Sequence, residues 1–159
     1  MLYGSKRETY RQVFIDQWQR YRQGLPPDGI GQRIVAVILE HPEYHGLLEH
    51  PDQALAADFS PVQGETNPFA HMGLHVALLE LLANGQPAGI VEAFARLTAR
   101  LDRHAAEHAF VECLGELIWQ GQRVGREPDL QELLPCVRRL HPDDGTGKRR
   151  FGRDPDDGL

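Results

Sequence analysis

The 159-residue sequence has little of several things, and each shortage excludes a class of protein. No apolar run approaches the roughly 20 residues that a membrane-spanning helix needs. The N-terminal segment lacks the apolar stretch of a signal peptide. There are only two cysteines, Cys113 and Cys136, and they form no CxxC pair, so we expect two reduced thiols. Together these shortages predict a cytoplasmic protein that does not enter a membrane.

Positive charge is missing from a long internal segment. Residues 34–95 contain no Lys or Arg, but they contain eight acidic residues and five of the eight histidines. Such a segment attracts cations and disfavours phosphate backbones. The basic residues near the two ends do not alternate with aromatic residues as they do in single-strand binders. We therefore expect no nucleic-acid partner, although a chance fluctuation in a mildly acidic chain is the competing explanation.

Helical periodicity accounts for almost all of the chain before residue 141. Apolar residues recur three and four positions apart, and no alternating strand pattern is present. Asn67 before Pro68, Asp102 and Asp129 are typical helix N-caps, and Pro42 predicts a helix end near His41. The sequence predicts an all-α fold, a compact bundle of about six to seven helices in one domain over residues 1–140.

The composition changes from His141 onward. Residues 141–159 combine mixed charges with Gly and Pro and contain almost no apolar side chains. A segment of this kind has too little apolar surface to bury. We therefore expect residues 141–159 to form a disordered, flexible charged tail.

Two predicted helices carry histidines four residues apart beside their apolar faces. One helix contains His71 and His75, and the other contains His104 and His108, followed by Glu112 at the same spacing. Side chains four residues apart lie on one side of a helix, and imidazole with carboxylate suits a transition metal. If the two helices face each other, we expect His71, His75, His108 and Glu112 to bind a divalent ion such as zinc or iron, with His104 as a fifth candidate.

Purely structural histidines are the alternative. A buried imidazole often bonds a backbone carbonyl, and these pairs lack the internal glutamate that acts as general base in HExxH proteins. The competing function is a helical module that binds a protein partner, with a surface formed by Glu116, Trp119, Gln122 and Arg123. No nucleophile, phosphate loop or substrate pocket is indicated, so the sequence leaves open whether the protein is an enzyme.

A third histidine pair, His41 and His45, ranks second as a candidate. Pro42 places His41 at or before a helix start, so the two imidazoles need not share a face, whereas His45 and Glu49 do. The tripeptide EHP occurs twice, at residues 40–42 and 49–51, and we interpret the two copies as similar helix starts.

Three segments resemble the signature of a bacterial family, the domain of unknown function 1841 family. They are NPFAHMGLHVALLELL, QPAGI and EHAFVECLGELIWQGQRVGREPD. The resemblance covers most of residues 8–140 and implies a small, cytoplasmic, helical protein. It also implies that His71, His75, His108 and Glu112 belong to the family's motif, whereas His104 precedes the matching segment. The family has no assigned activity, so the resemblance implies none.

Overall fold

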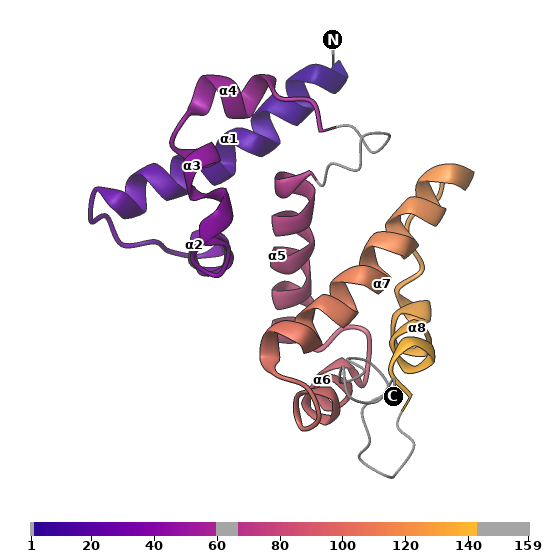
Figure 1. Cartoon of the computed structure of the whole chain (residues 1–159). Coiled ribbons are helices and arrows are strands. Elements are labelled where there is room, and N and C mark those ends of the chain that lie inside the picture. Colours follow the sequence, from indigo (N-terminus) through magenta and orange to yellow (C-terminus); the bar gives the residue numbers. More distant parts are fainter. Residues whose placement is uncertain (1, 60–66, 143–159) are drawn as a thin grey trace, which may run out of the picture. The chain divides into compact units, whose positions relative to one another are not determined.

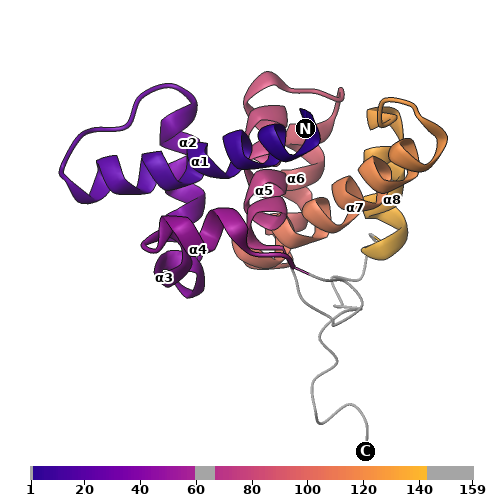
Figure 2. The same cartoon turned by 90° about the horizontal axis from the view of Figure 1, so that it is seen from above.

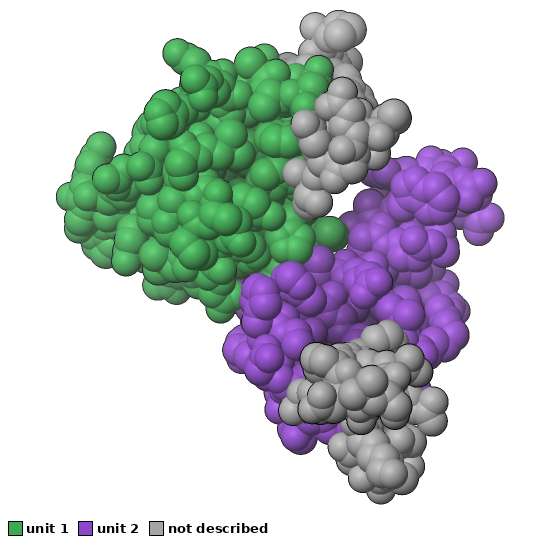
Figure 3. All heavy atoms as spheres, viewed as in Figure 1, with its two compact units in different colours: residues 1–76 green, residues 77–159 purple. Residues whose placement is uncertain are grey.

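The computed structural model describes residues 2–59 and 67–142, and the chain divides into two compact units (Figure 3). Unit 1 comprises residues 1–76 and unit 2 residues 77–159. All regular structure within the described ranges is helical, which confirms the all-α prediction. A single domain over residues 1–140 stays a prediction, and almost all of the expected tail, residues 143–159, lies outside the described residues.

The described ranges contain eight α-helices, more than the six to seven predicted, because two helices of unit 1 are very short (Figure 1). Unit 1 contains α1 (Leu2–Arg22), α2 (Ile30–Leu39), a 3-10 helix (Pro42–Tyr44), α3 (His45–Leu48), α4 (Pro51–Ala56) and the first half of α5 (Pro68–Asn84). Unit 2 contains the rest of α5, α6 (Ile90–Thr98), α7 (Arg103–Val124), a second 3-10 helix (Leu130–Glu132) and α8 (Leu133–Leu140). None of the helices in these ranges is long and apolar enough to cross a membrane.

The predicted N-caps form at three helix starts. The Asn67 carboxamide oxygen accepts from the backbone N–H groups of Phe69, at 3.0 Å, and of the next residue, at 3.2 Å. The Asp102 carboxylate accepts from the N–H of Ala105 at 2.8 Å. At the start of the second 3-10 helix, the Asp129 carboxylate accepts from the backbone N–H of Gln131 at 3.1 Å. Each cap satisfies backbone donors that the first turn of a helix leaves without an intrahelical acceptor.

Unit 1 is built around α1, which contacts α2, α3 and α4 (Figure 2). The buried face of α1 contains Phe14, Ile15 and Trp18, which are spaced as one side of a helix requires. Ile38 of α2 and Leu48 of α3 are also fully buried. The core of unit 1 therefore lies beside the point where α2 ends and the 3-10 helix begins.

A buried cation joins α1 to the end of α4. Arg11 is only 2% exposed, and its Nη1 donates to the carbonyl oxygens of Ala54, Leu55 and Ala57 at 2.9, 3.3 and 2.7 Å. The last carbonyls of a helix have no intrahelical donors, and a guanidinium is well suited to satisfy them. The guanidinium also lies 5.2 Å from the ring centroid of Phe69. Arg11 thus holds a helix that is too short to persist alone.

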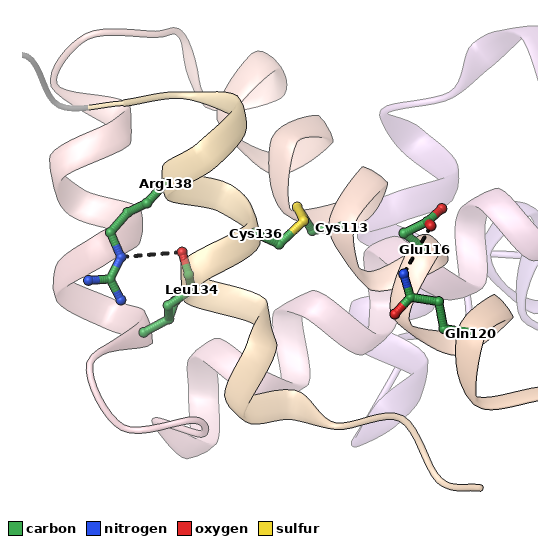
Figure 4. Close-up of a disulfide and its surroundings, with 6 residues drawn as sticks. All are labelled: Cys113, Glu116, Gln120, Leu134, Cys136 and Arg138. Atoms are coloured by element: carbon green, nitrogen blue, oxygen red, sulfur yellow. Dashed lines mark hydrogen bonds between the residues drawn. A yellow bond between two sulfur atoms is a disulfide. The ribbon is translucent and has the colours of Figure 1, made fainter. Parts of the chain in front are cut away.

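Unit 2 is held together by apolar packing and by one covalent bond. Phe94 of α6 packs on Phe110 of α7, with ring centroids 5.6 Å apart. α7 and α8 lie side by side (Figure 1 and Figure 2), and a disulfide joins Cys113 of α7 to Cys136 of α8 (Figure 4). The prediction of two reduced thiols was wrong. Sequence spacing does not reveal that α8 folds back along α7 and brings the two cysteines together.

We expect Arg11→Met to destabilise the protein by about 3 kcal/mol, because three carbonyls lose a charged donor. Urea unfolding followed by circular dichroism measures this loss. Arg7→Met is the matched control, since Arg7 pairs with Asp58 at 2.9 Å while both side chains are exposed, by 43% and 87%. Removal of an exposed pair should cost under about 1 kcal/mol. Equal losses in the two variants would contradict a capping role for Arg11.

Candidate metal centre

The two histidines of the EHP tripeptides adopt the same local structure. The backbone dihedrals φ and ψ are −125° and 66° at His41 and −123° and 75° at His50. In both cases Nδ1 lies close to the carbonyl oxygen four residues earlier, at 2.8 Å from Val37 O and 2.7 Å from Gly46 O. A residue before proline is kept out of the helical region, so the preceding helix ends and the imidazole folds back over its last turn. Each tripeptide thus ends one helix and, as predicted, starts the next.

Burial distinguishes these two histidines. His41 is 3% exposed, whereas His50 is exposed to solvent. A carbonyl oxygen only accepts hydrogen bonds, so Nδ1 of His41 donates to Val37 and the lone pair of the neutral imidazole lies on Nε2. A backbone bond of this kind fixes the tautomer and the ring orientation of many metal-binding histidines.

The predicted pair on α5, His71 and His75, is brought together. The two Nε2 atoms lie 3.2 Å apart, with His75 fully buried and His71 half-buried. Without an ion, one of these nitrogens donates to the other. Two imidazole nitrogens bound to one tetrahedral zinc lie about 3.3 Å apart, given Zn–N bonds of about 2.0–2.1 Å. The pair therefore has the nitrogen separation that tetrahedral zinc requires.

His41 joins this pair, and the three residues form what we call the three-histidine cluster. The ring centroid of His41 lies 5.1 Å from that of His71 and 4.8 Å from that of His75, which are themselves 4.7 Å apart. One ligand nitrogen from each of the three lies within 4.8 Å of the others. All three residues belong to unit 1, but they come from two segments, the end of α2 and the first half of α5.

Side chains of α1 contact α5 beside the histidine pair. Gly73 lies between the two histidines, and a Cβ there would overlap the hydroxyl of Tyr10 on α1. The same hydroxyl donates to the Phe69 carbonyl at 3.4 Å. The rings of Phe14 and Phe69 pack with centroids 6.1 Å apart. A larger residue at position 73 would therefore displace the end of the Tyr10 side chain.

Tyr44 borders the cluster. Its ring stacks on His41 with a centroid separation of 5.4 Å and an interplanar angle of 2°. Burial raises the pKa of the Tyr44 phenol, and the charge of Glu43 raises it further. The phenol therefore stays protonated at neutral pH and contributes a neutral wall to the cluster.

The predicted set on α7 lies in unit 2. The rings of His104 and His108 are 4.2 Å apart, His104 is exposed and His108 is half-buried. Glu112 is exposed. Burial lowers the pKa of His141, and the charge of Glu112 opposes this shift while that of Arg100 adds to it. The α7 set and the α5 pair belong to different units, so their convergence stays a prediction.

The second-ranked residues His45 and Glu49 have structural partners around Trp18. The imidazole of His45 packs on Trp18, with centroids 4.3 Å apart, and its Nε2 lies 2.8 Å from Ile38 O. Glu49 accepts from the indole N–H at 3.2 Å and pairs with Arg22 at 3.1 Å. His41 and His45 have different partners: the His41 ring contacts His71 and His75, whereas the His45 ring contacts Trp18.

Sequence reasoning missed one buried group and underrated another. Glu107 on α7 is 2% exposed, with the guanidinium of Arg103 at 3.9 Å. The sequence pattern that could have predicted this burial is the position of Glu107 on the apolar side of α7. It follows Ala106 directly and precedes Phe110 by three residues, and both of these are buried. His41 ranked second because the helical-face argument does not apply at a helix end.

These features define an all-helical protein with a buried histidine cluster. The chain belongs to the domain of unknown function 1841 family, whose sequence profile matches residues 6–139. This match confirms the resemblance inferred from the sequence. No curated protein and no solved structure matches the chain.

The metal-free protein should contain two opposite histidine tautomers in unit 1. We expect His41 to carry its proton on Nδ1, which faces Val37 O, and His45 on Nε2, which faces Ile38 O. Long-range ¹H–¹⁵N correlation spectra at about pH 8, where free imidazole is neutral, distinguish the two forms. A proton on Nε2 of His41 would rule out the orientation described above.

Proposed function

We propose that this protein binds a divalent transition metal ion through His41, His71 and His75. The observation that carries the proposal is the convergence of three imidazoles from two segments, with ligand nitrogens within 4.8 Å of one another. Two of the three are almost fully buried.

The donor set favours particular ions. Neutral imidazoles suit zinc, iron, nickel and copper, whereas magnesium and calcium prefer oxygen ligands. Neutral ligands leave the charge of the ion uncompensated, and the cluster lies in the acidic segment 34–95, which contains no Lys or Arg. That environment favours a cation. Zinc or iron is therefore the ion class that we propose.

The ligand set is proposed to extend to α7, as the sequence spacing predicts. His108 and Glu112 are the proposed contributors and His104 the alternative. Three histidines leave at least one position of a tetrahedral ion to be filled. This extension has its own test below.

A protein-interaction module with structural histidines is the second candidate function. One observation favours it: His41, His45 and His50 each have a ring nitrogen bonded to a backbone carbonyl, as structural histidines do. In addition, Trp119 is 52% exposed and lies under the guanidinium of Arg123 at 4.7 Å. Exposed aromatic and Arg side chains are frequent anchors in interfaces.

Two further expectations from the sequence remain proposals. The absence of Lys and Arg from residues 34–95 supports a protein that does not bind nucleic acid. The cytoplasmic location rested partly on two reduced thiols, and the disulfide removes that part of the argument.

Protein purified without a histidine tag should bind one zinc ion per chain, as measured by calorimetry and elemental analysis. Zinc should also stabilise the fold, by about 2.7 kcal/mol when free zinc is a hundredfold above its dissociation constant. We expect His75→Ala to abolish both effects, because it removes one of the two facing nitrogens on α5.

His50→Ala is the matched control for His41→Ala, since both residues bond a carbonyl four positions earlier but only His41 joins the cluster. The control should keep wild-type zinc affinity, while His41→Ala should weaken it at least about tenfold. If the histidines are purely structural, zinc does not stabilise the wild-type protein. In that case none of these variants changes the response to zinc.

The α7 ligands are tested by the same titration. We expect His108→Ala and Glu112→Ala each to weaken zinc binding about tenfold or more, since each removes a direct ligand. Glu116→Ala is the control, because Glu116 lies one turn further along α7 and bonds Gln120. Unchanged affinity in both ligand variants would confine the site to unit 1 and leave the three-histidine proposal standing.

A further inference from the structure

The disulfide of unit 2 joins a long, well-buried helix to a short one. α7 has 22 residues, nine of which are buried, whereas α8 has eight residues, of which only Leu133, Cys136 and Val137 are buried. Isolated helices shorter than about 12–15 residues are marginal in water. α8 therefore depends on its attachment to α7.

α8 packs along α7, and the disulfide is the covalent bond between the two helices. The hydrogen bonds drawn near the disulfide in Figure 4 lie within single helices, from Arg138 to Leu134 O in α8 and from Gln120 to Glu116 in α7. Beyond the end of α8, the guanidinium of Arg100 donates to the carbonyls of His141 and Pro142 at 3.2 and 2.9 Å. The disulfide is thus a covalent addition to the packing of α8 on α7 and to the bonds from Arg100.

The two sulfur-bearing residues differ in exposure. Cys113 is fully buried, whereas Cys136 is 7% exposed on the shorter helix. Both side chains are largely screened from solvent, so a nucleophile reaches the bond when the end of α8 frays. Local opening of a short helix is a route by which a buried bond reacts with solvent.

We propose that the Cys113–Cys136 disulfide is a reversible redox latch that holds α8 on α7. A thiolate of a dithiol reductant attacks Sγ of Cys136, the S–S bond breaks, and Cys113 leaves as a thiolate that takes a proton. The second thiol of the reductant then attacks the mixed disulfide and releases Cys136. The dithiol becomes a cyclic disulfide and supplies two electrons and two protons.

Reduction has a local structural consequence. Without the covalent link, α8 detaches more often and exposes Leu133, Val137 and the face of α7 around Cys113. α6 and α7 remain packed through Phe94 and Phe110. The latch therefore changes the surface of unit 2 without unfolding it.

Hydrogen exchange of the full-length, metal-free protein tests the latch. Backbone exchange is compared before and after treatment with dithiothreitol, and maleimide labelling counts the released thiols by mass. We expect two thiols per chain and exchange in residues 133–142 about ten times faster, with exchange in α7 little changed. Cys136→Ser should show the fast exchange with or without dithiothreitol.

The Arg100→Gln variant removes the bonds to the carbonyls of His141 and Pro142 and leaves the disulfide in place. It therefore distinguishes the contribution of the disulfide from that of Arg100. In the oxidised protein this variant should keep α8 protected, whereas after reduction α8 should exchange faster than in the reduced wild type. Equal protection of α8 in the oxidised and reduced proteins would overturn the proposal. A bond that dithiothreitol opens only together with global unfolding would also overturn it, because the disulfide would then be a permanent staple.

Discussion

The hydrogen bond from His41 Nδ1 to the carbonyl of Val37 connects the local structure of the chain to its chemistry. Pro42 keeps His41 out of the helical region, so α2 ends and the imidazole turns back over the helix. The bond fixes the tautomer and leaves Nε2 as the nitrogen with the lone pair. A helix that continued through this position would point the side chain elsewhere, and the α5 pair would lose its third imidazole.

The α5 pair lies beside a different contact, in which the Tyr10 side chain of α1 reaches Gly73. The Tyr10 hydroxyl occupies the space that any larger residue would need, and Phe14 packs on Phe69 one turn away. The cluster thus combines a helix end at His41 with an α5 pair that lies next to contacts from α1 side chains. The bond to Val37 orients His41, and full burial restricts His75, so these two imidazoles have defined orientations in the protein itself.

The short helices α4 of unit 1 and α8 of unit 2 are attached by different kinds of bond. α4 of unit 1 is held by the buried Arg11, which satisfies three carbonyls, whereas α8 is held by a disulfide. A guanidinium cap responds to no chemical signal at physiological pH, since it does not lose its proton there. A disulfide does respond, because a reductant can break it. The two short helices of similar length are therefore attached by bonds with different chemical sensitivity.

The sequence by itself determined the helices, their caps at Asn67, Asp102 and Asp129, and the shared face of His71 and His75, because each follows from interactions within a few residues. The family followed from linear motifs as well. Only the tertiary structure decided that His41 joins this pair, that His45 packs on Trp18 instead, and that Cys113 meets Cys136 across 23 residues. The physical reason is that spacing along one helix fixes which side chains share a face, whereas contacts between segments depend on how helices pack and where the chain turns back.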